Sequence, residues 1–538
     1  MTVHVEDENT PLIPVFNSDV GRMSKLQFRV ILGCLYANVF LASVDSTMVA
    51  TLLGKIASDL DAQENISWVA TSYLLSCAAC QPLFGKISDV FGRKPIILFS
   101  TVCFFVGCFI CGVGNNVITL VIGRLITGIG GGGFFTLASI TCSDIVLLKE
   151  RGLYQGYINI FFHLGAVSGG VLSGIIDSYL GWKWAFLLQV PVCFVTGTAV
   201  YWYLDLPPRS EDLDNDRKTH WQKFISLDWT GAFILVSSLL ALMVVSGFNP
   251  SDSHLVTSFY YISVLLGFTA FYFWELNVDQ PVIPVKMLHN QTVLASSLNC
   301  FFTSINMFSS LFYLPFYWSS VKNVSPLDCG YRSISGSVVA SFTSIFAGWL
   351  IKKTAKYKTL HYISAITIVL GSFLLYSSTR YDGAIKDSLI SLPLRYGASA
   401  DITTIIVAMI SSVPQSQQSL VTSISYGFRS TGSTIGVSLS SAILQSTLRK
   451  SLTGNFRNLE NTPLPPGWSL EMLSKAKQVA LENPSYAFTE GLPETVKDAI
   501  VSSYDSAGHS IFLFLIATAI CSAVCIHYTE ENELEEKT

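Results

Sequence analysis

Fourteen windows of about twenty apolar or small residues, separated by polar loops, divide the sequence. A helix that rises about 1.5 Å per residue crosses the roughly 30 Å hydrocarbon core of a bilayer over such a window and satisfies its own backbone hydrogen bonds. Only 13% of the 538 residues are charged, and the mean hydropathy is +0.48. The sequence therefore predicts an all-α membrane protein. The windows lie at about 28–52, 66–88, 95–114, 117–144, 155–176, 184–206, 227–248, 257–276, 292–319, 333–351, 360–378, 389–412, 419–446 and 509–528.

The distribution of basic residues predicts the orientation. Most Lys and Arg residues of the short loops lie on the side of the N-terminus, including the run from Lys352 to Lys358. Basic loops stay in the cytosol, and an even number of spans puts both ends on one side. We therefore expect cytosolic tails at 1–27 and 529–538. Segment 447–508 becomes a long non-cytosolic loop, whose amphipathic spacing predicts a small helical cap.

The fourth window contains the string Gly128-x-Gly130-x-x-Gly133, which has the form of a dinucleotide-binding fingerprint. That fingerprint requires a preceding strand and a βαβ unit, and neither is predicted here. Glycines at helical spacing in lipid allow a neighbouring helix to approach closely. We therefore expect these residues to pack helices rather than to hold a nucleotide. Arg124, one turn earlier, is a charge at membrane depth and a functional candidate.

The stretch GKISDVFGRKPIIL, residues 85–98, joins the second and third windows. It resembles the cytosolic loop signature G-x-x-x-D-x-x-G-R-K of the major facilitator superfamily, and GRLITGIGGGG (123–133) resembles the fourth-helix motif of the same family. The glycines allow tight backbone approach, and the charged residues can form an ion-pair latch at a helix end. The resemblance adds Asp144 as a partner of Arg93 in this gate. The motif residues are Gly85, Asp89, Gly92, Arg93 and Lys94.

Other stretches resemble particular members of that superfamily. LGAVSGGVLSGII resembles the fifth-helix antiporter motif, with Ala166 where proline is usual, and its packing glycines are Gly165, Gly169 and Gly170. SVDSTMVATLLGKIASDL (43–60) resembles the first-helix signature of the fourteen-helix drug:proton antiporter branch. TCSDIVLLKERGLYQGYIN (141–159) and GFRSTGSTIG (427–436) resemble the fungal vacuolar basic amino-acid transporters within that branch.

The resemblance implies the major facilitator fold. Two six-helix bundles, 28–206 and 277–528, would enclose a central cavity and be joined by a linker with two extra helices at 207–276. An internal echo supports this, since the basic stretch 348–358 follows the tenth window as 85–94 follows the second. We expect a monomer.

Charges inside the windows are the candidates for a transport site. Asp45 and Arg124 each lie about seven residues, or roughly 10 Å, from the outer end of their helices, so they could meet. Asp401 and Arg429 fall near mid-depth and form either a site or a neutralising pair that fixes helix contacts. The resemblance places Asp45 at the cavity wall. Polar candidates for the cavity are Asn38, Gln81, Asn159, Asn299 and Asn306.

These features predict a proton-coupled antiporter that moves lysine, arginine and histidine into the vacuole. A carboxylate at low dielectric can exchange a proton for a cation, so Asp45 would serve both ligands, with the proton gradient as the energy source and no cofactor. A multidrug/proton antiporter that exports cationic compounds and a non-transporting nutrient sensor are the alternatives. No catalytic or metal-binding group is predicted, and a net charge of −4 argues against nucleic acid.

The N-terminal tail carries a clue to location. Glu8, Leu12 and Ile13 match an acidic dileucine pattern of the kind that adaptor sorting complexes bind. Together with the resemblance this favours the vacuolar membrane, with the plasma membrane as the alternative. Asn65 lies in a glycosylation sequon of a non-cytosolic loop, close to the second window.

Overall fold

The computed structural model describes residues 24–60, 67–146, 148–205, 228–247, 254–278, 281, 285–414, 417–461, 468–482, 484–489 and 491–531. These residues form helices and connecting turns, with no strand among them. In chain order the α-helices are α2 (Lys25–Asp59), α3 (Ser67–Phe91), α4 (Arg93–Val113), α5 (Val117–Ile145), α6 (Leu148–Leu180), α7 (Lys183–Leu187), α8 (Gln189–Tyr203), α11 (Trp229–Gly247), α12 (His254–Asn277), α13 (Gln291–Lys322), α14 (Pro326–Thr354), α15 (Lys358–Tyr376), α16 (Ala384–Ser411), α17 (Gln418–Glu460), α18 (Leu470–Glu482) and α19 (Glu494–His527). Two 3-10 turns, η2 (Val285–His289) and η4 (Pro484–Phe488), complete the set.

Each of the fourteen predicted windows coincides with helix in the described part of the chain, the sixth being divided between α7 and α8. Eight helical segments among the described residues are long and apolar enough to cross a membrane by length and composition. The all-α membrane architecture predicted from the sequence is thus confirmed. Fourteen crossings and cytosolic tails stay predictions.

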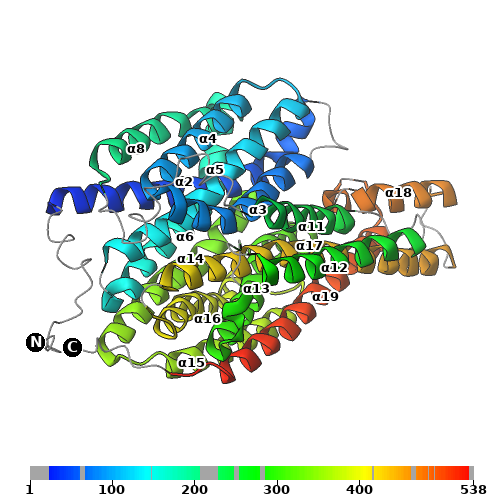
Figure 1. The fold of residues 1–538 in the computed structure, drawn as a ribbon. Coiled ribbons are helices and arrows are strands. Elements are labelled where there is room, and N and C mark those ends of the chain that lie inside the picture. Colours follow the sequence, from blue (N-terminus) through cyan, green and yellow to red (C-terminus); the bar gives the residue numbers. More distant parts are fainter. Residues whose placement is uncertain are drawn as a thin grey trace, which may run out of the picture.

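The helices form two groups that pack side by side (Figure 1). Helices α2 to α8 make the N-terminal half and α13 to α19 the C-terminal half, while α11 and α12 pack on each other and α11 also contacts α3 and α17. Helix α6 of the first half runs against α14 of the second. Helix α2 begins and α19 ends at the same end of the bundle, called here the terminal end (Figure 1).

The opposite end carries the predicted cap. Helix α17 continues to Glu460, and α18 and η4 fold back before α19 begins. Leu473, Ala476 and Ala480 on one face of α18 are buried in a common core with residues of α17 and α19. The Tyr504 hydroxyl donates to the Ala480 carbonyl at 2.7 Å, which ties α19 to α18. We call this end the cap end.

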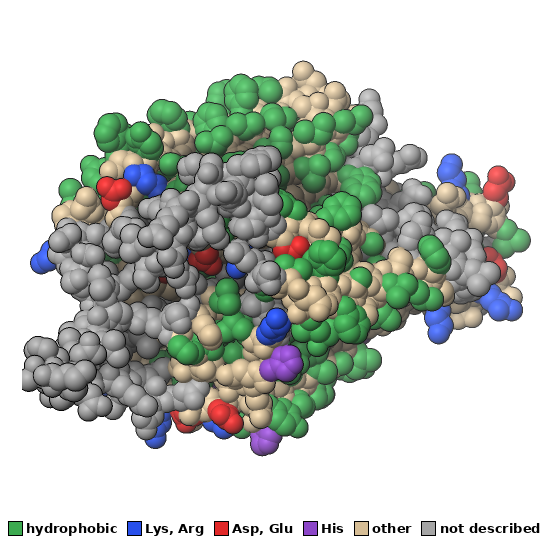
Figure 2. Space-filling model, viewed as in Figure 1, with side chains coloured by type: hydrophobic (Ala, Val, Ile, Leu, Met, Phe, Trp, Pro, Cys, Tyr) green, Lys and Arg blue, Asp and Glu red, His purple; other side chains and the backbone are tan. Residues whose placement is uncertain are grey.

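The outer surface fits a lipid environment. Large apolar side chains such as Phe99, Val102, Phe109 and Phe194 are half exposed or more, which a soluble protein would avoid in such number. Figure 2 shows hydrophobic side chains over the flanks of the bundle and many of the visible charged side chains toward its two ends.

The glycines of the fourth window pack α5 against two neighbours. A Cβ at Gly128 would collide with α3 at Tyr73, and one at Gly133 with α4 at Ser100. A Cβ at Gly130 would lie 2.5 Å from the Ser100 carbonyl oxygen and 2.6 Å from the Phe104 nitrogen. These close approaches leave no strand-turn-helix cradle for a nucleotide within this part of the chain. In the same way Gly165 and Gly169 bring α6 against α2, while a Cβ at Gly170 would come no closer than 3.9 Å to Thr51.

We predict that Gly130→Ala lowers the free energy of unfolding by about 1–3 kcal/mol, because both colliding atoms belong to the α4 backbone and the helices must separate. Thermal unfolding of the purified protein in detergent measures the change. Gly174→Ala is the matched control, since nothing lies within 4 Å of a Cβ at that position. Equal midpoints for the two variants would contradict the packing role.

Candidate functional site

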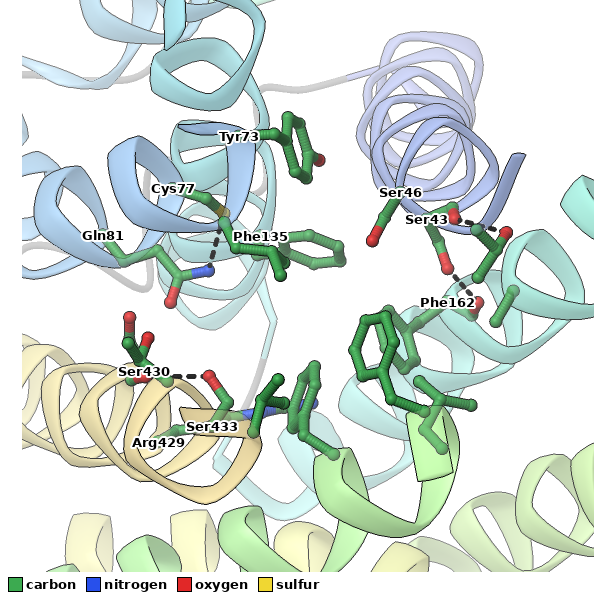
Figure 3. Close-up of a pocket in the computed structure, with 18 of the residues that line it drawn as sticks. Ser43, Ser46, Tyr73, Cys77, Gln81, Phe135, Phe162, Arg429, Ser430 and Ser433 are labelled. Carbon is green, nitrogen blue, oxygen red and sulfur yellow. Dashed lines mark hydrogen bonds between the residues drawn. The ribbon is translucent and has the colours of Figure 1, made fainter. Parts of the chain in front are cut away.

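A cavity lies between the two halves and encloses about 930 Å³ of atom-free space, including its mouth. Figure 3 shows α3 on one side of the cavity, with Tyr73, Cys77 and Gln81, and α17 on the other, with Arg429, Ser430 and Ser433. The lining residues are Ser43, Ser46, Thr47, Tyr73, Leu74, Cys77, Gln81, Phe135, Phe162, Ala166, Phe308, Leu311, Phe312, Tyr426, Arg429, Ser430, Ser433, Thr434, Val437 and Ser438.

Arg429 is the one charged side chain of the described cavity lining. Its guanidinium carbon lies 6.0 Å from the Tyr426 ring centroid, and the half-buried side chain has no ion pair or hydrogen bond with any described residue. The rest of the wall is hydroxyl groups, aromatic rings and the amide of Gln81. The cavity therefore presents one free positive charge, hydroxyl groups and ring faces, and no carboxylate within the described lining.

Contacts between the halves close the cavity toward the terminal end. Gln155 on α6 donates to the Tyr426 hydroxyl at 3.1 Å and accepts from Ser139 at 2.7 Å. Nearer the terminal end Gly152 meets Gly348, where a Cβ on Gly348 would lie 2.6 Å from the Gly152 carbonyl oxygen. Lys352 pairs with Glu150 at 2.6 Å at the surface. The cavity consequently lies on the cap side of these contacts.

Asp45 and Arg124 meet, as their matching depth suggested. Arg124 Nη1 lies 2.5 Å from Asp45 Oδ2, and the two side chains are 1% and 0% exposed. Gln189 donates to Asp45 Oδ1 at 3.3 Å, and Arg124 Nε donates to the Val69 carbonyl at 3.2 Å. Asp45 does not line the cavity in this structure, because it has no exposed surface. A cargo molecule in the cavity would not touch it.

Tyr73 stands between the cavity and this ion pair. The ring lines the cavity, while its centroid lies 4.1 Å from the guanidinium carbon of Arg124. The hydroxyl donates to the Ala42 carbonyl at 3.1 Å, which fixes the ring in place. An aromatic residue inside an apolar window gives no sequence signal that distinguishes it from ordinary core, so its position could not be predicted.

The alternative that Asp401 and Arg429 neutralise each other is wrong. Asp401 accepts hydrogen bonds from Asn299 at 3.1 Å and Thr303 at 2.6 Å, and its Oδ1 lies 3.0 Å from Nε2 of His361. All of these groups lie inside the C-terminal half, whereas Arg429 faces the cavity. Asp401 and Arg429 lie at similar depth along their helices, but their side chains face different directions around the helix axes.

The remaining polar candidates divide between cavity, interface and core. Gln81 lines the cavity, and Asn159 donates to Ser344 at 3.0 Å across the two halves. Asn299 belongs to the Asp401 network, and Asn306 lies 2.8 Å from the Thr518 hydroxyl within the C-terminal half. Asn38 is 1% exposed, and neither polar atom of its side chain has a hydrogen-bond partner among the described residues.

The loop between α3 and α4 contains the predicted ion-pair latch. Gly92 takes a φ of +87°, a conformation that glycine adopts without strain and that permits the tight turn between the helices. Buried Arg93 lies 2.6 Å from Asp89 and 3.0 Å from Asp144, and it also bonds Ser88. Lys94 pairs with exposed Asp205 at 3.4 Å. The charges assemble as the motif implied, and their role in gating stays a prediction.

Glu8, Leu12, Ile13 and Asn65, the residues of the predicted sorting and glycosylation motifs, lie outside the described residues.

Fungal transport proteins match nearly the whole chain. The Multidrug resistance protein fnx1 of Schizosaccharomyces pombe is 32% identical over 92% of this chain and 91% of its own length. The Vacuolar membrane amino acid uptake transporter fnx2 of the same organism is 30% identical over 95% of this chain and 86% of its own. The Vacuolar basic amino acid transporter 2 of Saccharomyces cerevisiae is 26% identical over 88% of this chain and 99% of its own length.

The fold also has solved counterparts. The proton:xylose symporter XylE superposes with a TM-score of 0.59 at 12% identity, covering 94% of this chain and 96% of that one. Such low identity indicates a shared fold alone. Residues 35–437 match the family described as the Major Facilitator Superfamily. With two helical halves around a cavity, the ion-paired motif that joins α3 to α4, and this match over most of its length, the chain belongs to the major facilitator superfamily of membrane transporters.

Proposed function

We propose that this protein is a proton-coupled antiporter that moves basic amino acids, namely lysine, arginine and histidine, across the vacuolar membrane into the vacuole. The vacuolar relatives support the location and the amino-acid class. The similarity to the multidrug resistance protein fnx1 supports the alternative function, a multidrug/proton antiporter that exports cationic compounds. The family fixes a transporter of small molecules rather than an enzyme.

The observation that carries the choice is the free guanidinium of Arg429. A guanidinium recognises a carboxylate with two parallel hydrogen bonds, and every amino acid brings an α-carboxylate. A drug that carries only positive charge would meet repulsion at this group and find no carboxylate in the described lining. The ammonium or guanidinium of a basic side chain can lie against the aromatic faces of residues such as Phe308 and Phe312.

The proton and the cargo then bind to different groups in this conformation. The cargo occupies the cavity, and the proton is taken by carboxylates away from the wall, of which Asp45 is the candidate in the N-terminal half. Protonating Asp45 would remove the charge that holds Arg124. Rocking of the halves about the cavity would supply alternating access.

Uptake of labelled lysine into proteoliposomes with an acidic interior tests the proposal. We expect accumulation that collapses when the pH gradient is dissipated, and competition by arginine and histidine. A drug exporter would instead accumulate a lipophilic cation and give no lysine uptake. A sensor would bind lysine without flux. Either result would remove the proposed function.

A further inference from the structure

The C-terminal half contains a second buried acidic group, and it is coupled to a histidine. His361 on α15 and Asp401 on α16 are both 0% exposed, and Nε2 of the histidine lies 3.0 Å from Oδ1 of the carboxylate. Asn299 and Thr303 on α13 donate to the same carboxylate. Ser522 on α19 donates to the Asn299 carbonyl oxygen at 2.6 Å and so completes the network. Four helices of this half therefore meet at one carboxylate.

The histidine is incompletely satisfied. Nδ1 of His361 is buried and has no hydrogen-bond partner among the described residues. A neutral ring that donates from Nε2 leaves a lone pair unused at Nδ1, and a protonated ring leaves a buried N–H unused. Either state costs free energy, which a purely structural network would avoid by placing a hydroxyl or carbonyl there. The vacant nitrogen provides a place where a proton can be added or removed.

Among the described residues no Lys, Arg or Glu forms an ion pair with Asp401. Titratable groups that interact electrostatically with Asp401 include the thiols of Cys300 on α13 and Cys525 on α19, and Arg429 on α17 interacts in the same way with Cys300. The net charge of the pair is −1 when a neutral imidazole faces an ionised carboxylate, and it is 0 when the pair holds one further proton.

Helix α13 connects this network to the cavity. Asn299 and Thr303 bond Asp401, and Phe308, Leu311 and Phe312 line the cavity further along the same helix. Five residues, or about 7.5 Å along a helix, separate Thr303 from Phe308. A change in the bonds to Asp401 would shift α13 against α15, α16 and α19 and carry the cavity wall with it.

We propose that Asp401 and His361 form an exchangeable proton site in the C-terminal half, which couples the pH gradient to cargo movement through α13. This inference rests on the proposed function and adds His361 and a second location for the proton. A proton enters the pair without any other covalent bond being made or broken, although the hydrogen bonds to Asp401 change, and it leaves by the same groups when the halves reorient.

Proteoliposomes that contain Asp401→Asn test the site. With one proton exchanged per cationic cargo, one pH unit supports a concentration ratio of up to about tenfold in the parent. We expect the variant to reach a ratio near one, while lysine counterflow at equal pH continues within about twofold of the parent, because exchange needs no net proton movement. Counterflow of the parent should change with pH and that of the variant should not.

His361→Gln gives an independent variant with the same expectation, which decides the matter if Asp401→Asn fails to fold. Asp505→Asn is the matched control, since this carboxylate lies in the same half but accepts from Tyr317 outside the network. Gradient-driven accumulation that persists in both network variants would overturn the proposed proton site. Folded variants that lose counterflow as well as accumulation would also overturn it. Parent protein without gradient-driven uptake would instead refute the proposed function.

Discussion

Asp45→Asn is expected to lower the free energy of unfolding by about 3–5 kcal/mol, because it leaves the Arg124 guanidinium buried without a counter-charge. Asparagine keeps the shape of the side chain and its one oxygen can still accept from Gln189, but its amide nitrogen then faces Arg124, so the charge and the hydrogen bond to the guanidinium are lost together. The pair has no exposed surface on either side chain, and water cannot replace the lost partner. A surface ion pair would contribute about 1 kcal/mol or less.

Thermal unfolding in detergent, with denaturant series for the free energies, measures this effect. Asp205→Asn is the control, since Asp205 is 95% exposed in its pair with Lys94 and the substitution is chemically the same. The double variant Asp45→Asn/Arg124→Gln should recover part of the stability, because it removes both buried charges. A cost at Asp45 as small as that at Asp205 would mean that the ion pair is open to water.

Transport assays on the same variants separate two roles for Asp45. Variants that fold and still accumulate lysine along a pH gradient would remove Asp45 from proton coupling and leave it as a fixed link between α2 and α5. Variants that fold, retain counterflow and lose accumulation would make it a second proton-binding carboxylate besides Asp401.

The positions of the helices, and the depth of each residue along its helix, could be predicted from the sequence because a lipid environment restricts which structures an apolar segment can form. Apolar windows of membrane length can fold only as helices in lipid, so every window corresponds to helix in the described chain. Depth along a helix follows from residue counting, which is why Asp45 was expected beside Arg124. The latch of Arg93 with Asp144 came from the resemblance of its loop to a known motif.

Contacts that depend on rotation about a helix axis could not be predicted. Asp401 and Arg429 lie at similar depth, yet one faces the interior of a half and the other the cavity. His361 lies within the first turn of α15, where a histidine has no sequence signature that separates it from a loop residue. The register in which α13, α15, α16 and α19 pack brings these side chains together, and one sequence does not reveal that register.

The composition of the cavity argues against a single site shared by the proton and the cargo. A lone carboxylate in a cavity wall would serve both ligands in turn. Here the described wall carries a guanidinium instead, and the buried carboxylates of Asp45 and Asp401 lie behind it in networks of their own. Under the proposed function, separate sites would allow the proton to act on helix packing while the cargo is held by its carboxylate.

Arg429→Gln is expected to raise the KM for lysine by about 30-fold or more, because truncation of a charged partner to a carboxylate costs about 2 kcal/mol or more. The sharper readout compares lysine with cadaverine, its decarboxylated analogue, as competitors for uptake. The parent should prefer lysine strongly, since cadaverine carries the same two ammonium groups but has no carboxylate to pair with Arg429. The variant should bind lysine and cadaverine with similar affinity, because neutral glutamine neither forms an ion pair with the carboxylate of lysine nor repels the ammonium groups of cadaverine.

Arg457→Gln is the matched control, as Arg457 lies on the same helix α17 but is exposed near the cap end and outside the cavity. Its lysine-to-cadaverine preference should equal that of the parent. If Arg429→Gln keeps the parent preference while folding normally, the guanidinium does not contact the carboxylate of the cargo, and the argument for an amino acid over a cationic drug fails with it. If lysine and cadaverine lose affinity equally, Arg429 shapes the cavity rather than recognising an anion. Selective loss for lysine alone identifies Arg429 as the group that distinguishes an amino acid from a simple cation.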